Sequence, residues 1–454
     1  MLARRELLKG VAGWMGLAPK PLLSPEDELF LRDQAQRVVL AARLRPGDSD
    51  GGRRNETGYT IRVPGGNMGY PAFWIRDAVM MLGDGLIPAE ELEGWICLIC
   101  STVPERDWQV RLGVVVPAYA VADHINYDGK PTFYPGSYET GDKQGGAPFG
   151  KYPPLDDNFY FLTAVWRHWA VTRKTVLLQS SVKTASGELR LAELCERIYA
   201  SPPADAATGL CTAGDVETEN AKDFGFCDTV SKSGKLLFPS LLKFVAARQM
   251  VEVFHALGQN ETARRFAREA GRIRAAIPLT FLHASGQGEA QSEAWLHSAT
   301  RVGNQPDVWG SAYAVWCGAV DGDLAQSLGR ALARAYREKT AVREGCVRHI
   351  LTTDRVNHGG WQRASSRLGE YQNGGYWGTP TGWYIAALAR TDRLAAAAMA
   401  QDYIRFLRDH MRPDGLAEAW EWFNPDTGGH ANPTYVATVA LPWLSLLQAG
   451  LRNG

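Results

Sequence analysis

The sequence predicts an all-α protein, a single (α/α)6 toroid built from six helical hairpins. Three observations lead to this fold class. Helical patterns of apolar residues recur along the whole chain, and they come in pairs joined by short polar turns such as 257–260 and 388–393. Long loops rich in Gly, Pro and aromatic residues, at 131–154, 208–238 and 340–380, separate the pairs. Six hairpins in a ring would alternate outer and inner helices and gather these loops at one end, where sites tend to be built.

The first helix has the clearest start signal. Ser24 is a capping residue, Pro25 suits the first helical position, and Glu26 and Asp27 place acids in the first turn. Its apolar pattern continues to about Leu44. Further helices are expected at 73–86, 88–103, 156–172, 189–199, 239–257, 261–281, 307–319, 323–337, 381–388, 392–411 and 433–451. Strand signals are few, and the alternating segment 57–63 predicts a short hairpin outside the helical body.

The N-terminal segment resembles a twin-arginine export signal. Arg4 and Arg5 precede Glu6, Leu7 and Leu8, and a mildly apolar stretch follows. The alternative is an ordinary basic N-terminal helix. We expect residues 1–23 to be the signal and residues 24–454 to form one catalytic domain, with the protein periplasmic or secreted.

Composition excludes several classes of function. The chain has 49 Lys plus Arg and 49 Asp plus Glu, so it lacks the basic excess that nucleic-acid binding requires. No run reaches the roughly 18 apolar residues of a membrane span. Fifteen Trp, 16 Tyr and 15 Phe suit either a large core or a carbohydrate site, because sugars present apolar C–H faces ringed by hydroxyls. Among the seven cysteines, the C-x-x-C of Cys97 and Cys100 lies in an apolar helix and predicts core packing, so no metal site is expected.

The first of four notable strings is F-W-I-R-D at 73–77. Trp74 can stack on a sugar face, while Arg76 and Asp77 supply a donor fork and an acceptor for hydroxyls. The alternative is a structural Arg–Asp pair at a helix start.

The second string carries Asp228 in the Gly-punctuated, aromatic loop F-G-F-C-D-T at 224–229, ahead of a helix. Apolar surroundings disfavour the charged form of a carboxyl group, which suits a general acid. A turn or capping Asp is the alternative.

The third string is Y-Q-N-G-G-Y-W at 371–377. Gln372 and Asn373 each offer two donors and an acceptor between aromatic residues, a set that can read hydroxyls. A well-satisfied turn would have the same composition.

The fourth string is E-A-W-E-W-F-N-P-D-T-G at 418–428. A carboxylate such as Glu421, between Trp420 and Trp422, is costly to leave in an apolar wall without a partner or a task. The alternatives are that Glu421 is a surface residue, or that Glu418 performs its role.

Taken in order, the four strings resemble the six-hairpin glycosidases, the (α/α)6-barrel glycoside hydrolases related to glucoamylase, trehalase, processing α-glucosidase and the glucosidase domain of glycogen debranching enzyme. The resemblance spans residues 70–429, and it departs from the debranching type where Cys227 follows Phe226 ahead of the acid. It implies that Asp228 is the general acid and Glu421 the general base of an inverting hydrolase acting on a short, α-linked oligosaccharide or glycoside. It further implies a sugar subsite lined by Trp74, Arg76, Asp77, Asp157, Gln372, Asn373, Trp377 and Trp420.

Inverting cleavage needs one protonated and one ionised carboxyl on opposite faces of the sugar, and it needs no cofactor or metal. No P-loop or dinucleotide fingerprint is present. Two alternatives stay open. One is a sugar epimerase or polysaccharide lyase on the same toroid, with His349, His358 or His430 as proton carrier; the other is a noncatalytic carbohydrate-binding protein.

Overall fold

The computed structural model describes residues 22–65, 70–109, 115–133, 152–213, 229–284 and 294–451. Arg4, Arg5 and Asp228 lie outside the described residues, as does most of the expected export signal.

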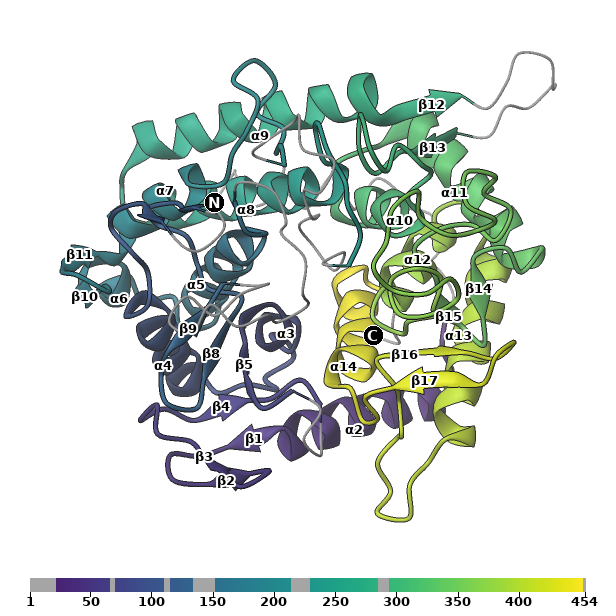
Figure 1. Cartoon of the computed structure of the whole chain (residues 1–454), viewed down its shortest axis with the longest axis horizontal. Helices are drawn as coiled ribbons and strands as arrows, with labels where there is room; N and C mark the ends of the chain where they lie inside the picture. The colour runs from purple at the N-terminus through teal and green to yellow at the C-terminus, as the bar shows by residue number, and fades with distance from the viewer. Residues whose placement is uncertain are drawn as a thin grey trace.

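Six helices form a closed inner ring (Figure 1). Each packs against the next along the chain, and the last packs against the first. They are α3 (Ile75–Met80), α5 (Asp157–Thr172), α8 (Leu237–Ala256), α10 (Val308–Cys317), α12 (Thr381–Ala389) and α14 (Val436–Gln448).

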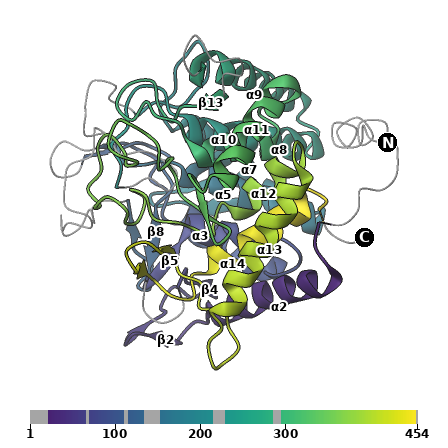
Figure 2. The same ribbon diagram turned by 90° about the vertical axis from the view of Figure 1, so that its right-hand side faces the viewer.

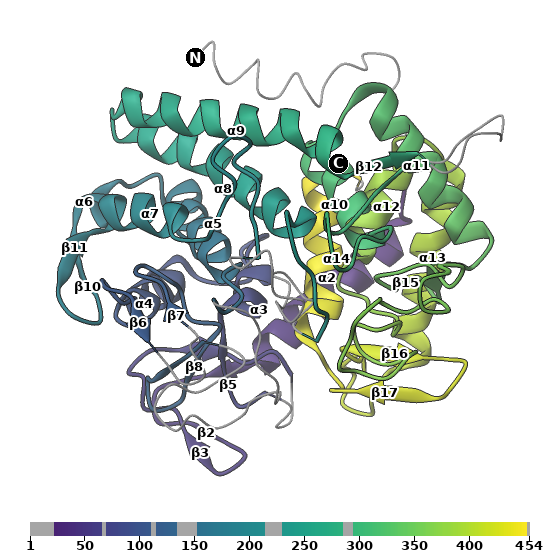
Figure 3. The ribbon, with the colours of Figure 1, turned by 45° about the horizontal axis from the view of Figure 1, so that its top comes forward.

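Six outer helices alternate with the inner ones along the chain. They are α2 (Pro25–Ala41), α4 (Ala89–Cys100), α7 (Leu191–Ala200), α9 (Asn260–Phe281), α11 (Gly322–Arg337) and α13 (Arg393–Asp409). Helices α8 and α9 run side by side as one long hairpin (Figure 3), and α2 packs on α14, which joins the two ends of the ring. A further short helix, α6 (Val176–Gln179), precedes α7. The predicted (α/α)6 toroid is confirmed.

The two layers differ in how they bury their side chains, and the sequence pattern explains the difference. Outer helix α11 buries a stripe that includes Ala325, Leu328 and Leu332, at the spacing of one helix face. Inner helix α10 buries every residue from 308 to 315, because neighbours cover it on all sides. The start of α2 is as predicted: the Ser24 side chain accepts from the Asp27 backbone N–H, and Pro25 opens the helix.

The prediction for 57–63 was wrong about the pairing partner. The helix α2 ends at Ala41, and the chain then forms β1 (Arg43–Leu44), which pairs with β4 (Ile61–Arg62). Because both strands are only two residues long, alternation within 57–63 cannot identify a partner that lies before it in the chain.

The loops contain short antiparallel strand pairs, and these pairs are more numerous than the sequence indicated. The pairs are β2 (Ser49–Asp50) with β3 (Arg53–Arg54), β6 (Trp108–Gln109) with β7 (Val115–Val116), β10 (Ser181–Lys183) with β11 (Glu188–Arg190), β12 (Leu282–Ala284) with β13 (Ala294–Leu296), β14 (Val342–Arg343) with β15 (Cys346–Val347), and β16 (Trp422–Asn424) with β17 (Gly429–Ala431). One three-stranded sheet has the order β5 (Ala72–Trp74), β8 (His124–Asn126), β9 (Pro131–Thr132).

The loops that lead into the inner helices gather on one side of the ring, on the left of Figure 2. The first, third and fourth strings singled out in the sequence lie in, or directly after, loops of this kind, as the toroid predicts, whereas only Thr229 of the second string lies within the described residues. Cys97 is half-buried and Cys100 is buried, and both are free thiols, in keeping with core packing. Within the described ranges, no helix is both long and apolar enough to cross a membrane.

Candidate active site

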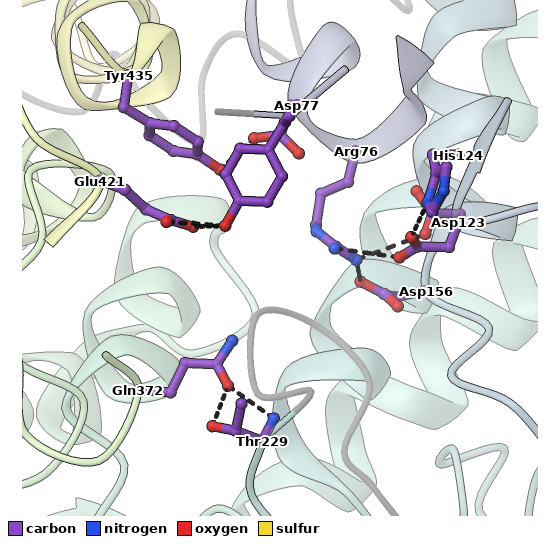
Figure 4. A network of polar contacts seen from close by, with 11 residues as sticks. Arg76, Asp77, Asp123, His124, Asp156, Thr229, Gln372, Glu421 and Tyr435 are labelled. Carbon is purple, nitrogen blue, oxygen red and sulfur yellow. Dashed lines mark hydrogen bonds and ion pairs between the residues drawn. The ribbon is translucent and has the colours of Figure 1, made fainter. Parts of the chain in front are cut away.

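The first turn of α3 and the loops ahead of three other inner helices bring polar side chains to a common space (Figure 4). Arg76 and Asp77 open α3, Asp156 precedes α5, Gln372 precedes α12, and Glu421 comes from the loop ahead of α14. Each inner helix begins where such a loop ends, so residues far apart in the chain meet at one mouth of the ring.

Glu421 is a buried carboxylate whose position is fixed by hydrogen-bond donors. Only 2% of the residue is exposed. The Tyr70 hydroxyl lies 3.0 Å from its Oε1 and 2.9 Å from its Oε2, and Asn432 Nδ2 donates to Oε2 at 2.6 Å. Its backbone N–H is shared between the carbonyls of Ala431 and Asn432. Donors to both oxygens favour the ionised form of a carboxyl group, which is the form that a general base requires.

A second buried carboxylate, Asp77, lies beside this first one. The Tyr435 hydroxyl donates to Asp77 Oδ1, and Tyr435 also lies close to Glu421. Burial raises the pKa of Asp77 to about 6, although Arg76 and the Tyr435 hydroxyl act in the opposite direction. Tyr435 therefore lies near both acids and is hydrogen-bonded to Asp77.

Arg76 lies at the centre of a cluster of carboxylates. Its guanidinium is 3.1 Å from Asp156 Oδ2, 3.4 Å from Asp123 Oδ1 and 3.5 Å from Asp157 Oδ2. Burial alone would lower the pKa of Arg76, but the surrounding carboxylates outweigh it and raise that pKa well above its ordinary value. The guanidinium is thus charged and oriented, which makes it a rigid donor fork.

The carboxyl groups around Arg76 outnumber this one cation, and the pKa values of two of them are raised. Burial raises the pKa of Asp156 and Asp157, and repulsion from neighbouring carboxylates adds to the rise, while Arg76 opposes it. A buried carboxyl group that keeps its proton can donate as well as accept a hydrogen bond. The cluster therefore offers both kinds of partner to a hydroxyl-rich ligand.

Aromatic side chains flank these acids. Trp74 is half-buried, its ring is stacked on His124 at a centroid distance of 4.1 Å, and Tyr70 meets it edge to face at 5.0 Å. Tyr70 thus contacts both the indole and the Glu421 carboxylate. An aromatic face beside oriented polar groups is the arrangement that a sugar ring requires.

Gln372 connects two of the loops. Its Oε1 accepts from the backbone N–H of Thr229 at 2.8 Å and from the Thr229 hydroxyl at 2.7 Å. Figure 4 shows the amide nitrogen of Gln372 directed toward the common space. Two backbone hydrogen bonds between Tyr376 and Phe423 connect the loop of Gln372 to that of Glu421. The third and fourth strings of the sequence are therefore held side by side.

Three chains of known structure share this architecture. A metal-independent α-mannosidase of Streptococcus pneumoniae, solved with α-1,6-mannobiose in a non-productive complex, is 14% identical over 99% of this chain and 98% of its own, with a TM-score of 0.56. The family 15 glucoamylase of Hypocrea jecorina is 13% identical over 94% and 72%, also at 0.56. A glycosidase variant in complex with glucose is 14% identical over 95% and 100%, at 0.53.

The chain has the fold of the six-hairpin glycosidases. At these identities the likeness concerns the fold alone. No protein-family model matches the sequence, and no curated protein matches it either. Function has to be argued from the side chains at the mouth of the ring.

The structure brings most of the residues expected at the sugar subsite to this mouth. Trp74, Arg76, Asp77, Asp157 and Gln372 lie there with Glu421. Asp228 lies outside the described residues, and its described neighbour is Thr229.

Three other expected subsite residues have their side chains in the packing behind the mouth. Asn373 is buried; its Oδ1 accepts from the Trp361 backbone and its Nδ2 donates to the Ser366 carbonyl, so it fastens its own loop. Trp377 is fully buried and donates to the Tyr371 carbonyl. Trp420 packs against Phe406 and His410 at the C-terminal end of α13, and against His430 on β17.

Sequence reasoning missed five residues that contact the site: Tyr70, Asp123, His124, Asn432 and Tyr435. None lies in a string of chemically unusual composition, and each acts through a contact with a residue distant in the chain. For Tyr70 and Tyr435, the one available signal was their proximity in sequence to Trp74 and Glu421.

The described residues hold no group of three or more His, Cys, Asp or Glu placed to bind a metal ion. Of the histidines considered as proton carriers, His349 is buried and stacked on Trp309 at 3.5 Å, while His358 and His430 are exposed. Glu421, by contrast, has hydrogen-bond donors at both of its carboxylate oxygens.

Proposed function

We propose that this chain is a glycoside hydrolase and that its sugar-cleaving site is the mouth of the ring. The observation that carries the proposal is Glu421: a buried carboxyl group that accepts hydrogen bonds from Tyr70 and Asn432, at the same mouth of the ring as Arg76 and Trp74. Taking a carboxylate out of water costs free energy that hydrogen bonds must offset, so a buried carboxylate built into a polar mouth points to a function.

The proposed reaction is an inverting hydrolysis. Glu421 takes a proton from a water molecule as the water oxygen bonds to the anomeric carbon. The glycosidic C–O bond breaks, and the leaving oxygen receives a proton from a carboxylic acid on the opposite side of the sugar. We assign that acid to Asp228 from its motif. In support, the next residue, Thr229, is bonded to Gln372, whose loop pairs with that of Glu421.

The donor sugar would stack on Trp74 and exchange hydrogen bonds with Arg76, Asp77, Asp157 and Gln372. In this proposal Asn373, Trp377 and Trp420 shape the wall from behind. We propose a short α-linked oligosaccharide or glycoside as substrate. Because similar chains were solved with glucose and with α-1,6-mannobiose, α-glucosides and α-mannosides are the first to test.

The test is a panel of aryl glycosides and disaccharides, each assayed with and without a chelator. We expect cleavage that the chelator does not affect. For the best substrate, proton NMR of the fresh product should show the inverted anomer first. Absence of any cleavage would contradict the hydrolase proposal, and a retained anomer would contradict the inverting mechanism alone.

We also propose that the protein is exported. The support is the pair Arg4 and Arg5 ahead of an apolar stretch. Fractionation of cells that make the full chain or its Arg4→Lys, Arg5→Lys variant tests this. Export should be lost in the variant, and an equal cytoplasmic distribution of both would contradict the proposal.

A further inference from the structure

His124 occupies a place in the site that the proposed reaction does not use. It lies on β8, directly opposite Trp74 on β5, in an antiparallel register that also pairs Phe73 with Ile125. Residues directly opposite one another in such a pair point to the same face of the sheet, with their Cβ atoms about 5 Å apart. The register alone therefore brings the imidazole against the indole.

The ring contact is close and nearly parallel. The centroids of His124 and Trp74 are 4.1 Å apart, with an angle of 28° between the planes. His124 is 1% exposed, whereas Trp74 is half-buried. The imidazole thus covers one face of the indole from inside the protein, and His124 has almost no surface with which to touch a sugar itself.

The same imidazole also supports Arg76. His124 Nδ1 is 2.7 Å from Asp123 Oδ2, and the other oxygen of Asp123 is 3.4 Å from the Arg76 guanidinium. Because Asp123 accepts from Arg76 on that other oxygen, the hydrogen-bond network assigns a proton to Nδ1 of His124. Asp123 is then held from both sides, which fixes the direction of the guanidinium.

We propose that His124 is a positioning residue for the donor sugar, acting on Trp74 through its ring and on Arg76 through Asp123. One side chain thereby sets both an apolar and a polar contact of the subsite. The inference rests on the proposed function, because it presumes that Trp74 and Arg76 bind the sugar. It adds a residue that no string in the sequence indicated.

Two substitutions separate the two roles. In His124→Asn, the amide nitrogen takes the place of Nδ1 and keeps the bond to Asp123, but the ring is lost. In His124→Phe, the ring is kept and the bond is lost. His124→Ala removes both. The matched control is His255→Asn, an exposed residue at the C-terminal end of α8, far along the helix from the mouth.

The experiment measures kcat and KM with the best substrate, and the dissociation constants of glucose and mannose by titration calorimetry. Loss of an aromatic contact or of a hydrogen bond should each raise KM and weaken sugar binding about fivefold. If the two roles are independent, His124→Ala should lose about 25-fold. In all three variants kcat should stay within about threefold, because the carboxylates are untouched.

The possible failures are distinguishable. If the wild type cleaves glycosides but His124→Ala matches it within twofold in KM and in sugar binding, the inference is wrong and the proposed function stands. A loss of kcat above a hundredfold at constant KM would make His124 a proton carrier and overturn the positioning role. If none of the three variants folds, as judged by circular dichroism, His124 is a structural residue and the inference fails. If the wild type neither cleaves nor binds any sugar, the proposed function fails and the inference falls with it.

Discussion

Replacing Glu421 by Gln removes a charge while leaving the local structure almost unchanged. The amide has the size of the carboxylate, and the hydrogen bonds with Tyr70 and Asn432 can both still form. Its oxygen can accept from Asn432 Nδ2, and its nitrogen can donate to the Tyr70 oxygen, because a tyrosine hydroxyl both donates and accepts. We therefore expect a change in unfolding free energy of no more than about 1 kcal/mol.

The effect on rate should be much larger. An amide cannot take a proton from water, and loss of a general base typically costs about 10²–10⁴ in rate, which is about 3–5 kcal/mol of transition-state stabilisation. The matched control is Glu418→Gln, three residues away, where the side chain is half-exposed. We expect that control to keep kcat/KM within about threefold of the wild type.

The assay compares kcat/KM of both variants on the best substrate, with melting temperatures measured in parallel. A folded Glu421→Gln protein that retains more than a tenth of wild-type activity would refute the assignment of the base. Equal losses at both positions would refute it too, because Glu418 would then be as important as Glu421.

Three further predictions follow from the same geometry. Tyr70→Phe removes a donor to both oxygens of Glu421; kcat/KM should fall about 10–100-fold and the acidic limb of its pH profile should move to higher pH, because the ionised carboxylate loses support. Asp77→Asn tests the raised pKa of about 6. Between about pH 4 and 6 the carboxyl group of Asp77 loses its proton in the unfolded chain before it does so in the folded one, so the wild type should lose up to about 3 kcal/mol of unfolding free energy relative to the variant as pH rises. Urea titrations of both proteins at pH 4 and pH 7 measure this difference, and the same change in both proteins would contradict it. Gly375→Ala would place a Cβ 2.7 Å from the Tyr371 carbonyl oxygen, so a cost of about 2 kcal/mol is expected on denaturation, and an unchanged stability would mean that the loop adjusts freely.

The ring itself was predictable from the chain. Helical periodicity, the capping signal at Ser24 and the short turn at 257–260 are local properties, and each is present in a few neighbouring residues. Because paired helices with long intervening loops leave few ways to bury their apolar faces, the toroid and the gathering of the loops at one end followed from the same pattern. The strand pairs did not, since segments of two or three residues carry too little alternation to specify a partner such as that of β1.

The site was predictable in part, and the division has a physical reason. Trp74, Arg76 and Glu421 lie in segments of unusual composition, so the sequence alone identifies them as candidates. The direction of a side chain in a loop depends on contacts made across the fold. Only the tertiary structure shows that the side chains of Asn373 and Trp377 are buried behind the mouth and do not face it. The same contacts brought in Tyr70, Asn432, Tyr435, Asp123 and His124. The positions of these five residues are set by strand register and by hydrogen bonds between distant segments, and a single sequence holds no record of either.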